Sequence, residues 1–332
     1  MRFVFKLFII FLSLALTVLL LVLVFSRFYT PHTDQKFGVS FSAPLSRYLG
    51  IDPKATLEAG LKDLGFKKIR LSAYWSDVER ERDKFDFSDI YWQLDLAEKY
   101  NAEVIMSVGE KLPRWPECHV PDWAKSLPYE EREQRILRLV EESVKKLKKY
   151  DSIKIWQVEN EAIFGFGGEC PKKTRSFLMK EIQLVKSLDD RPTMVTDSGE
   201  MGRWIPSATS GADMFGSTLY FQIYNKYLGY FNYPQLPILW HFKGGVLKVF
   251  TGVTDVYGVE LQAEPWVIKG FIEVPVEQQI ELMNPQILTH YIDLAKQIGF
   301  KDYYLWGLEW WYWMKEKHNY PDMWEAIKFL PK

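Results

Sequence analysis

The chain has 332 residues, a net charge of −1, 26% charged residues and 47% hydrophobic residues. The near-neutral balance argues against a nucleic-acid-binding protein, which needs a basic face or stripe. The hydrophobic fraction is ample for one large core. The length alone allows two domains, but α/β barrels of roughly 250 residues are single domains.

The first part of the chain is strongly apolar. Arg2 and Lys6 precede an uncharged run from Leu7 to Phe25, which as a helix nearly spans a bilayer core of roughly 30 Å. No A-x-A-like cleavage site follows, so the sequence favours an uncleaved anchor; a long, cleaved signal peptide is the alternative. The basic residues before the run place the body of the protein outside the cytoplasm. We therefore predict a transmembrane helix within 1–29, a linker at 30–36 and a catalytic domain at 37–332.

Beyond residue 37, short apolar runs alternate with amphipathic segments. In chain order the predicted elements are a strand at 37–44, a helix at 53–66, a strand at 67–75, a helix at 87–101, a strand at 103–109, a helix around 136–147, a strand at 153–161, a helix at 174–188, a strand at 192–200, a short helix at 203–211, a strand at 214–224, a helix at 240–250, a strand at 256–266, a helix at 285–300, a strand at 302–311 and a helix at 322–330. Eight such units predict a single (β/α)₈ TIM barrel. A doubly wound open sheet is the alternative, but the chain has no G-x-G-x-x-G or Walker motif.

Polar side chains stand where the predicted strands end, and in such barrels the C-terminal strand ends carry the active site. They are Arg70, Glu110, Asn160, Glu161, Tyr220, Glu264, Trp306 and Glu309. Glu161 and Glu264 end opposite strands and would face each other across the barrel mouth. Two such carboxyl groups suit glycoside hydrolysis, in which one donates a proton and the other attacks the anomeric carbon. Arg70 and Tyr220 are expected to keep the attacking carboxylate ionised.

Several motifs carry a family resemblance. "VENEA" and "LQAEPW" resemble the Asn-Glu pair of strand four and the Glu of strand seven in clan A of the retaining glycoside hydrolases, the cellulase, β-glucosidase and β-galactosidase-like barrels. "IRLSAYWSDVERERDKFDFS", "DMFGSTLY" and "LWGLEWW" are similar to the strand-two, strand-six and strand-eight regions of that clan. The resemblance covers nearly all of residues 37–330. Each motif alone is weak, but their order and spacing together are fairly specific.

The resemblance implies a role for each of these residues. Glu161 would be the acid/base and Glu264 the nucleophile, oriented by Arg70 and Tyr220. Asn160 would bind the 2-hydroxyl of the sugar, and Trp306 would stack under the ring. Two positions depart from the clan: Glu110 or Lys111 takes the place of a common His after strand three, and Thr218 replaces an Asn of strand six. The implied substrate is a β-linked oligo- or polysaccharide, and no cofactor is expected. The five histidines show no H-x-x-H or HExxH spacing, so no metal site is predicted.

Other readings stay open. A catalytically silent carbohydrate-binding barrel would present the same groove, and a transglycosylase would use the same carboxylates. Glu260 and Glu309 are interpreted as polar residues of the barrel rim, and Glu159 as an ion-pair partner. Because strands alternate, Asn160 and Glu161 can both face inward only with a local twist at the strand end. Cys118 and Cys170 lie in loops predicted to be neighbours, which favours a disulfide outside the cytoplasm over two free thiols.

Overall fold

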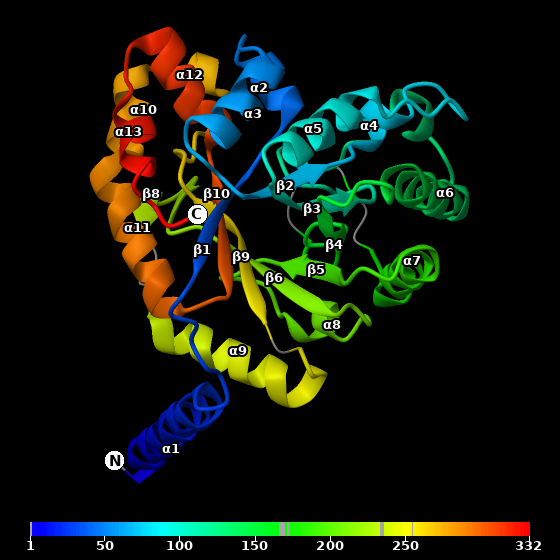
Figure 1. Ribbon diagram of the computed structural model, residues 1–332. Helices are drawn as coiled ribbons and strands as arrows, with labels where there is room; N and C mark the ends of the chain where they lie inside the picture. Colours follow the sequence, from blue (N-terminus) through cyan, green and yellow to red (C-terminus); the bar gives the residue numbers. More distant parts are fainter. Residues whose placement is uncertain (1, 166–169, 171–172, 233–235, 254) are drawn as a thin grey trace.

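The computed structural model describes all residues except 1, 166–169, 171–172, 233–235 and 254. Eight parallel strands close into a barrel in the order β1-β10-β9-β6-β5-β4-β3-β2 (Figure 1). The barrel strands are β1 (Lys36–Ser40), β2 (Lys68–Ser72), β3 (Glu103–Val108), β4 (Ile153–Val158), β5 (Thr193–Asp197), β6 (Met214–Leu219), β9 (Val256–Gln262) and β10 (Asp302–Trp306). The predicted (β/α)₈ barrel is confirmed.

Helices surround the strands. They are α2 (Ala43–Tyr48), α3 (Pro53–Lys62), α4 (Trp75–Val78), α5 (Ser88–Lys99), α6 (Tyr129–Leu147), α7 (Arg175–Leu188), α8 (Ile205–Ala208), α9 (Pro237–Thr251), α10 (Val276–Leu282), α11 (Pro285–Ile298), α12 (Leu308–His318) and α13 (Asp322–Ile327), with 3₁₀ turns η1 (Asp122–Ala124) and η2 (Phe271–Glu273). Local chemistry sets several helix starts. Asp52 accepts a 2.7 Å hydrogen bond from the Ala55 amide, with Pro53 as the first helical residue of α3. Asn284 caps α11 before Pro285 in the same way.

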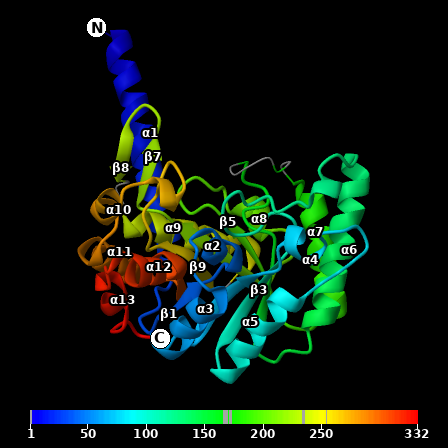
Figure 2. The same cartoon turned by 90° about the horizontal axis from the view of Figure 1, so that it is seen from above.

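One predicted strand is divided in the structure. The apolar run 214–224 was predicted to form one strand, but β6 ends at Leu219, and Gln222–Asn225 (β7) pairs antiparallel with Gly229–Asn232 (β8). The break arises because the amides of Phe221 and Gln222 both donate to the side-chain oxygen of Gln262, at 3.0 Å each. The prediction of a single strand is wrong here, and the result is a hairpin that projects from the barrel (Figure 2).

The barrel interior has an apolar part and a polar part. Its apolar residues form one buried cluster, made of Ile105, Ile155, Met194, Tyr257, Val259 and Tyr304. Further along the same strands, the inward side chains become polar: Ser107, Gln157 and Glu260 are all buried. Polar groups buried inside a barrel are normally hydrogen bonded, and those that are not commonly have a binding or catalytic role. This polar layer carries the candidate site.

The N-terminal helix α1 (Arg2–Ser26) projects away from the barrel beyond α9 (Figure 1). Within the segment Val4–Ser26, the most apolar window of 18 residues has a mean hydropathy of 3.2 and no buried residues. Length and composition make it a candidate membrane span, and an N-terminal signal sequence has the same features. The following segment, 30–36, lies against the barrel, where the His32 amide donates to the Gly299 carbonyl at 2.9 Å.

Candidate active site

Arg70 connects several side chains of the polar layer through hydrogen bonds. Its guanidinium is 1% exposed and donates three side-chain hydrogen bonds: Nη1 to Glu260 at 2.9 Å, Nη2 to Asn160 at 2.8 Å and Nε to Gln157 at 2.8 Å. It thereby ties β2 to β9 and to the end of β4. A buried guanidinium requires such partners because an unpaired charge in a barrel interior is strongly unfavourable.

Glu260 is the carboxylate that Arg70 and Tyr220 hold. The Tyr220 hydroxyl donates to Oε2 at 2.9 Å, while Arg70 binds Oε1. The expectation that these two side chains orient Glu264 is therefore wrong. It was also wrong to treat Glu260 as a rim residue, because it is buried in the polar layer.

A bulge in β9 explains why the strand pattern missed Glu260. On the neighbouring strand β6, Ser217 pairs with Gly258 but Thr218 pairs with Glu260, so the register shifts by one residue at Val259. Val259 belongs to the apolar cluster inside the barrel, and strict alternation would point Glu260 outward. The bulge turns Glu260 inward as well, which is how bulges commonly re-aim a side chain beside an active site.

Glu161 follows the end of β4 and is 6% exposed. The chain turns there through left-handed backbone at Glu159 (φ 62°) and Glu161 (φ 48°), which is the local twist that the sequence required. The Thr218 hydroxyl donates to Glu161 Oε1 at 3.1 Å. Burial raises the pKa of Glu161 well above its usual value, and the negative charges of Glu117 and Glu260 raise it further.

Asn160 is linked to both carboxyl-bearing residues, to Glu260 through Arg70 and to the Glu161 amide through Thr196. Its Oδ1 accepts from Arg70 and, at 3.0 Å, from the Thr196 hydroxyl. Its Nδ2 is buried and has no hydrogen-bond partner within the described part of the chain. Both N–H donors of this amide are therefore left for a ligand.

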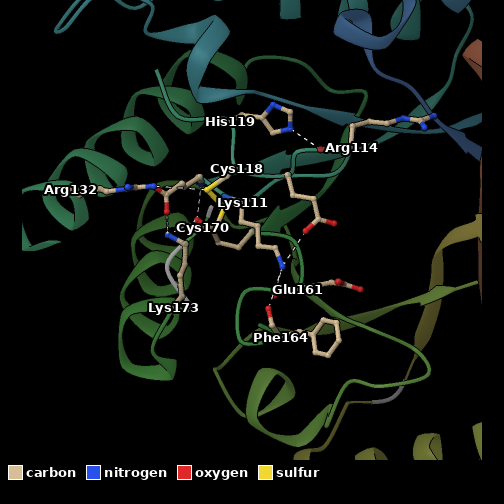
Figure 3. Close-up of a disulfide and its surroundings, with 12 residues drawn as sticks. Lys111, Arg114, Cys118, His119, Arg132, Glu161, Phe164, Cys170 and Lys173 are labelled. Atoms are coloured by element: carbon tan, nitrogen blue, oxygen red, sulfur yellow. Dashed lines mark hydrogen bonds and ion pairs between the residues drawn. A yellow bond between two sulfur atoms is a disulfide. The ribbon is translucent and has the colours of Figure 1, made fainter. Parts of the chain in front are cut away.

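Glu117 was not predicted as a site residue. It belongs to the loop after β3, which the predicted disulfide Cys118–Cys170 joins to the loop after β4, with Cα atoms 5.3 Å apart (Figure 3). Lys111 pairs with Glu117 at 3.2 Å and donates to the Glu161 carbonyl at 3.1 Å. Burial raises the pKa of Glu117 to about 7; Lys111 opposes this shift and Glu260 adds to it.

Glu264 belongs to a second charged group, on the side of β10. Arg114 forms ion pairs with Glu264 and, at 2.8 Å, with Glu309. Its guanidinium also lies 4.1 Å from the ring centre of Trp306. Glu309 is fully buried, so its interpretation as a rim residue is wrong. Burial raises the pKa of both Glu264 and Glu309, and Arg114 limits the rise. The Trp306 face predicted to stack on a sugar is thus covered by Arg114.

Glu110 lies apart from these two groups. It forms ion pairs with Arg132 of α6 and, at 3.2 Å, with Lys173. Lys173 also pairs with Glu159 at 3.2 Å, as predicted for an ion-pair role of Glu159. Of the two residues that stand where the clan has a His, Lys111 is the one that approaches Glu161, and Glu110 links the loop to the outer helices.

The charge on Glu117 gives a first testable prediction. Glu117→Gln removes a negative neighbour that raises the pKa of Glu161, so that pKa should fall. If activity requires protonated Glu161, the alkaline limb of the kcat/KM profile should move to lower pH, by up to about one pH unit. The control Glu81→Gln changes an exposed carboxylate that pairs only with Lys84 among the described residues, and should leave the limb in place. A limb that stays fixed or moves to higher pH in Glu117→Gln would contradict this coupling.

No protein-family model matches the sequence, and no curated protein matches it. Solved structures do match. Xylanase 10B from Thermotoga petrophila RKU-1, solved with xylobiose, is 16% identical, with 83% of each chain covered and a TM-score of 0.55. GH5_18 from Streptomyces cattleya, solved with GlcNAc, is 12% identical, covering 83% of this chain and 71% of that one, with a TM-score of 0.56. GH5_18 from Bifidobacterium longum subsp. longum is also 12% identical, covering 82% and 69%, with a TM-score of 0.58.

These identities are low, so the likeness concerns the fold. It extends over more than four fifths of this chain in each case. The chain therefore shares its (β/α)₈ barrel with a xylanase and with two GH5_18 proteins.

Proposed function

We propose that this protein is a retaining glycoside hydrolase that cleaves β-linked glycosides, with Glu161 as the acid/base and Glu260 as the nucleophile. The observation that carries the proposal is that Arg70 and Tyr220 both donate hydrogen bonds to Glu260. The nearby Glu161 is buried, and its pKa is raised in part by the charge of Glu260. Two carboxyl groups held in opposite protonation states are what double displacement needs. The fold shared with glycoside-cleaving neighbours supports the same reading, as an analogy.

The first step would use the two groups in different ways. Glu161 gives its proton to the departing glycosidic oxygen, while the Glu260 carboxylate attacks the anomeric carbon and forms a glycosyl ester. Arg70 and Tyr220 each donate to one oxygen of Glu260 and so hold the carboxylate in position for attack. Once Glu260 becomes an ester, it loses its negative charge, which is one of the causes of the raised pKa of Glu161. Ionised Glu161 is then suited to remove a proton from the water that hydrolyses the ester.

Three further side chains around the two carboxyl groups are candidates for binding the sugar. The free Nδ2 of Asn160 can donate to a sugar hydroxyl next to the reacting carbon. Stacking of a ring on Trp306 requires Arg114 to leave the face it covers. Glu264, which the sequence favoured as nucleophile, would then act as a hydrogen-bond acceptor for substrate or for Arg114. A silent binding barrel is less well supported, because both proposed catalytic carboxyl groups are present in the polar layer.

We also propose that α1 anchors the protein, with the barrel outside the cytoplasm. Its apolar composition and the Cys118–Cys170 disulfide support this placement. The substrate would then be a glycan met at or beyond the cell surface.

The direct test of the acid/base is Glu161→Ala on a panel of aryl β-glycosides. Loss of a general acid typically reduces the rate by about 10²–10⁴-fold, and most for substrates with poor leaving groups. Azide should restore turnover of activated substrates and yield a β-glycosyl azide, because the ester on Glu260 still forms and azide replaces water.

Two results would contradict the assignment. One is a Glu161→Ala variant that keeps wild-type turnover on poor leaving groups. The other is an azide product of α configuration, since a single displacement would then have occurred. Thr218→Val serves as a matched variant. It removes the hydroxyl that donates to Glu161 and accepts from the Gly199 amide but keeps the Glu161 carboxyl, so its loss of rate should be far smaller.

A further inference from the structure

The end of α1 is fixed against α9. The Phe25 ring lies 6.0 Å from that of Phe242 and 5.9 Å from that of Phe250. A side chain at Gly245 would collide with the Phe25 carbonyl, so the glycine is what lets the two backbones approach. Because α9 is part of the barrel domain, this contact fixes the orientation of the last turn of α1 relative to the barrel.

The β7–β8 hairpin carries exposed apolar side chains at its tip. Tyr227 is 81% exposed and Leu228 is 71% exposed. The Trp266 ring lies 5.3 Å from that of Tyr220, which places the segment that follows β9 beside the residues that lead into β7. That segment adds two more exposed apolar residues, Ile268 at 57% and Ile272 at 58%. Lys226 and Lys269 are exposed within the same stretches. We call Lys226, Tyr227, Leu228, Ile268, Lys269 and Ile272 the hairpin patch.

The hairpin and α1 point the same way. Figure 2 shows both projecting beyond the barrel on one side, and Figure 1 shows them separated, with α1 beyond α9 and β8 near α11. The start of α9 adds exposed Leu236 and Leu239. Exposed apolar groups gathered on one side of a soluble domain mark an interaction surface.

We propose that the hairpin patch inserts into the headgroup region of the bilayer that α1 spans, so that the barrel is held at a fixed orientation by two separate supports. The proposal rests on the anchoring role proposed for α1. The chemistry fits a lipid surface: tyrosine favours the membrane–water interface, aliphatic tips enter the acyl boundary, and lysines attract anionic headgroups. A sugar-binding surface would instead present hydrogen-bonding groups among its aromatic rings.

The test uses the full chain in vesicles of phosphatidylcholine and phosphatidylglycerol. Both native cysteines are in the disulfide, so one introduced thiol can carry an environment-sensitive fluorophore. Leu228→Cys reports on the hairpin patch, Leu16→Cys on α1, and Lys146→Cys on the exposed face of α6. Spin-labelled lipids quench a fluorophore only where it contacts the bilayer.

The proposal expects strong quenching at Leu228→Cys and Leu16→Cys and none at Lys146→Cys. Quenching at Leu16→Cys alone would overturn the proposal and leave the anchor intact. No quenching at Leu16→Cys would refute the anchor and, with it, the inserted patch. A Leu228→Cys label that lipid does not quench but that is shielded from aqueous iodide would also overturn it, and would indicate that a second copy or another protein covers the patch.

Discussion

Glu260→Gln is expected to reduce kcat by roughly 10⁴–10⁶-fold on any glycoside that the wild type cleaves, the range seen when a group of a nucleophilic machinery is lost. The amide cannot attack. Its oxygen can still accept from Arg70, and its NH₂ can donate to the Tyr220 hydroxyl, which reverses the direction of that hydrogen bond. The side chain keeps its shape and its hydrogen bonds, so the fold should form, but Arg70 loses its counter-ion and the thermal midpoint is expected to fall. The measurement is kcat and KM on an aryl β-glycoside, with the thermal midpoint as a check on the fold.

Glu264→Gln is the matched control for that experiment. It removes the same charge four residues away, from a side chain that pairs with Arg114 rather than Arg70. We expect it to keep at least about 10²-fold more activity than Glu260→Gln. The reverse order of the two variants would return the nucleophile to Glu264, where the sequence motif alone placed it.

Arg114→Ala is expected to cause the largest loss of stability. It leaves Glu264 and Glu309 buried without their shared counter-ion, and breaking a buried pair in this way typically costs about 3–5 kcal/mol. A barrel of this size should lose at least about 6 °C in its thermal midpoint. The midpoint is measured on the detergent-solubilised full chain at several pH values.

The pH dependence of that loss has a defined sign. Burial already raises the pKa of Glu264 and Glu309, and Arg114 lowers both, so its removal raises them further. A carboxyl group whose pKa is higher in the folded than in the unfolded state stabilises the fold at low pH. That contribution is lost as the pH rises through the pKa of the folded state. The loss in thermal midpoint caused by Arg114→Ala should therefore become smaller as the pH is lowered. Lys84→Ala, which breaks an exposed pair with Glu81, should show no deficit at any pH. A deficit that grows in acid would contradict the assignment.

Elements with a clear period could be predicted from the sequence. The amphipathic run of α6 and the alternation of strands with helices were sufficient to predict a closed eight-stranded barrel. The strand ends also placed Arg70, Asn160 and Glu161 together, because parallel strands end at one face of the barrel.

What could not be predicted depends on departures from ideal geometry. Glu260 turns inward only through the register shift at Val259, which no two-residue period reveals. Arg114 and Glu117 adopt left-handed backbone, with φ values of 84° and 64°, in a loop shaped by tertiary contacts. One signal was available: a buried Arg70 needs a carboxylate partner, and Glu260 lies nearer to the strand interior than Glu264.

The most direct test of the central claim is to trap the glycosyl ester with a panel of 2-deoxy-2-fluoroglycosyl fluorides and to identify the labelled residue by peptide mass spectrometry. A retaining mechanism leaves the sugar covalently attached to its nucleophile. The account predicts a single label on Glu260, absent from Glu260→Gln. A label on Glu264, or wild-type turnover of β-glycosides with inversion of configuration and no label, would contradict it.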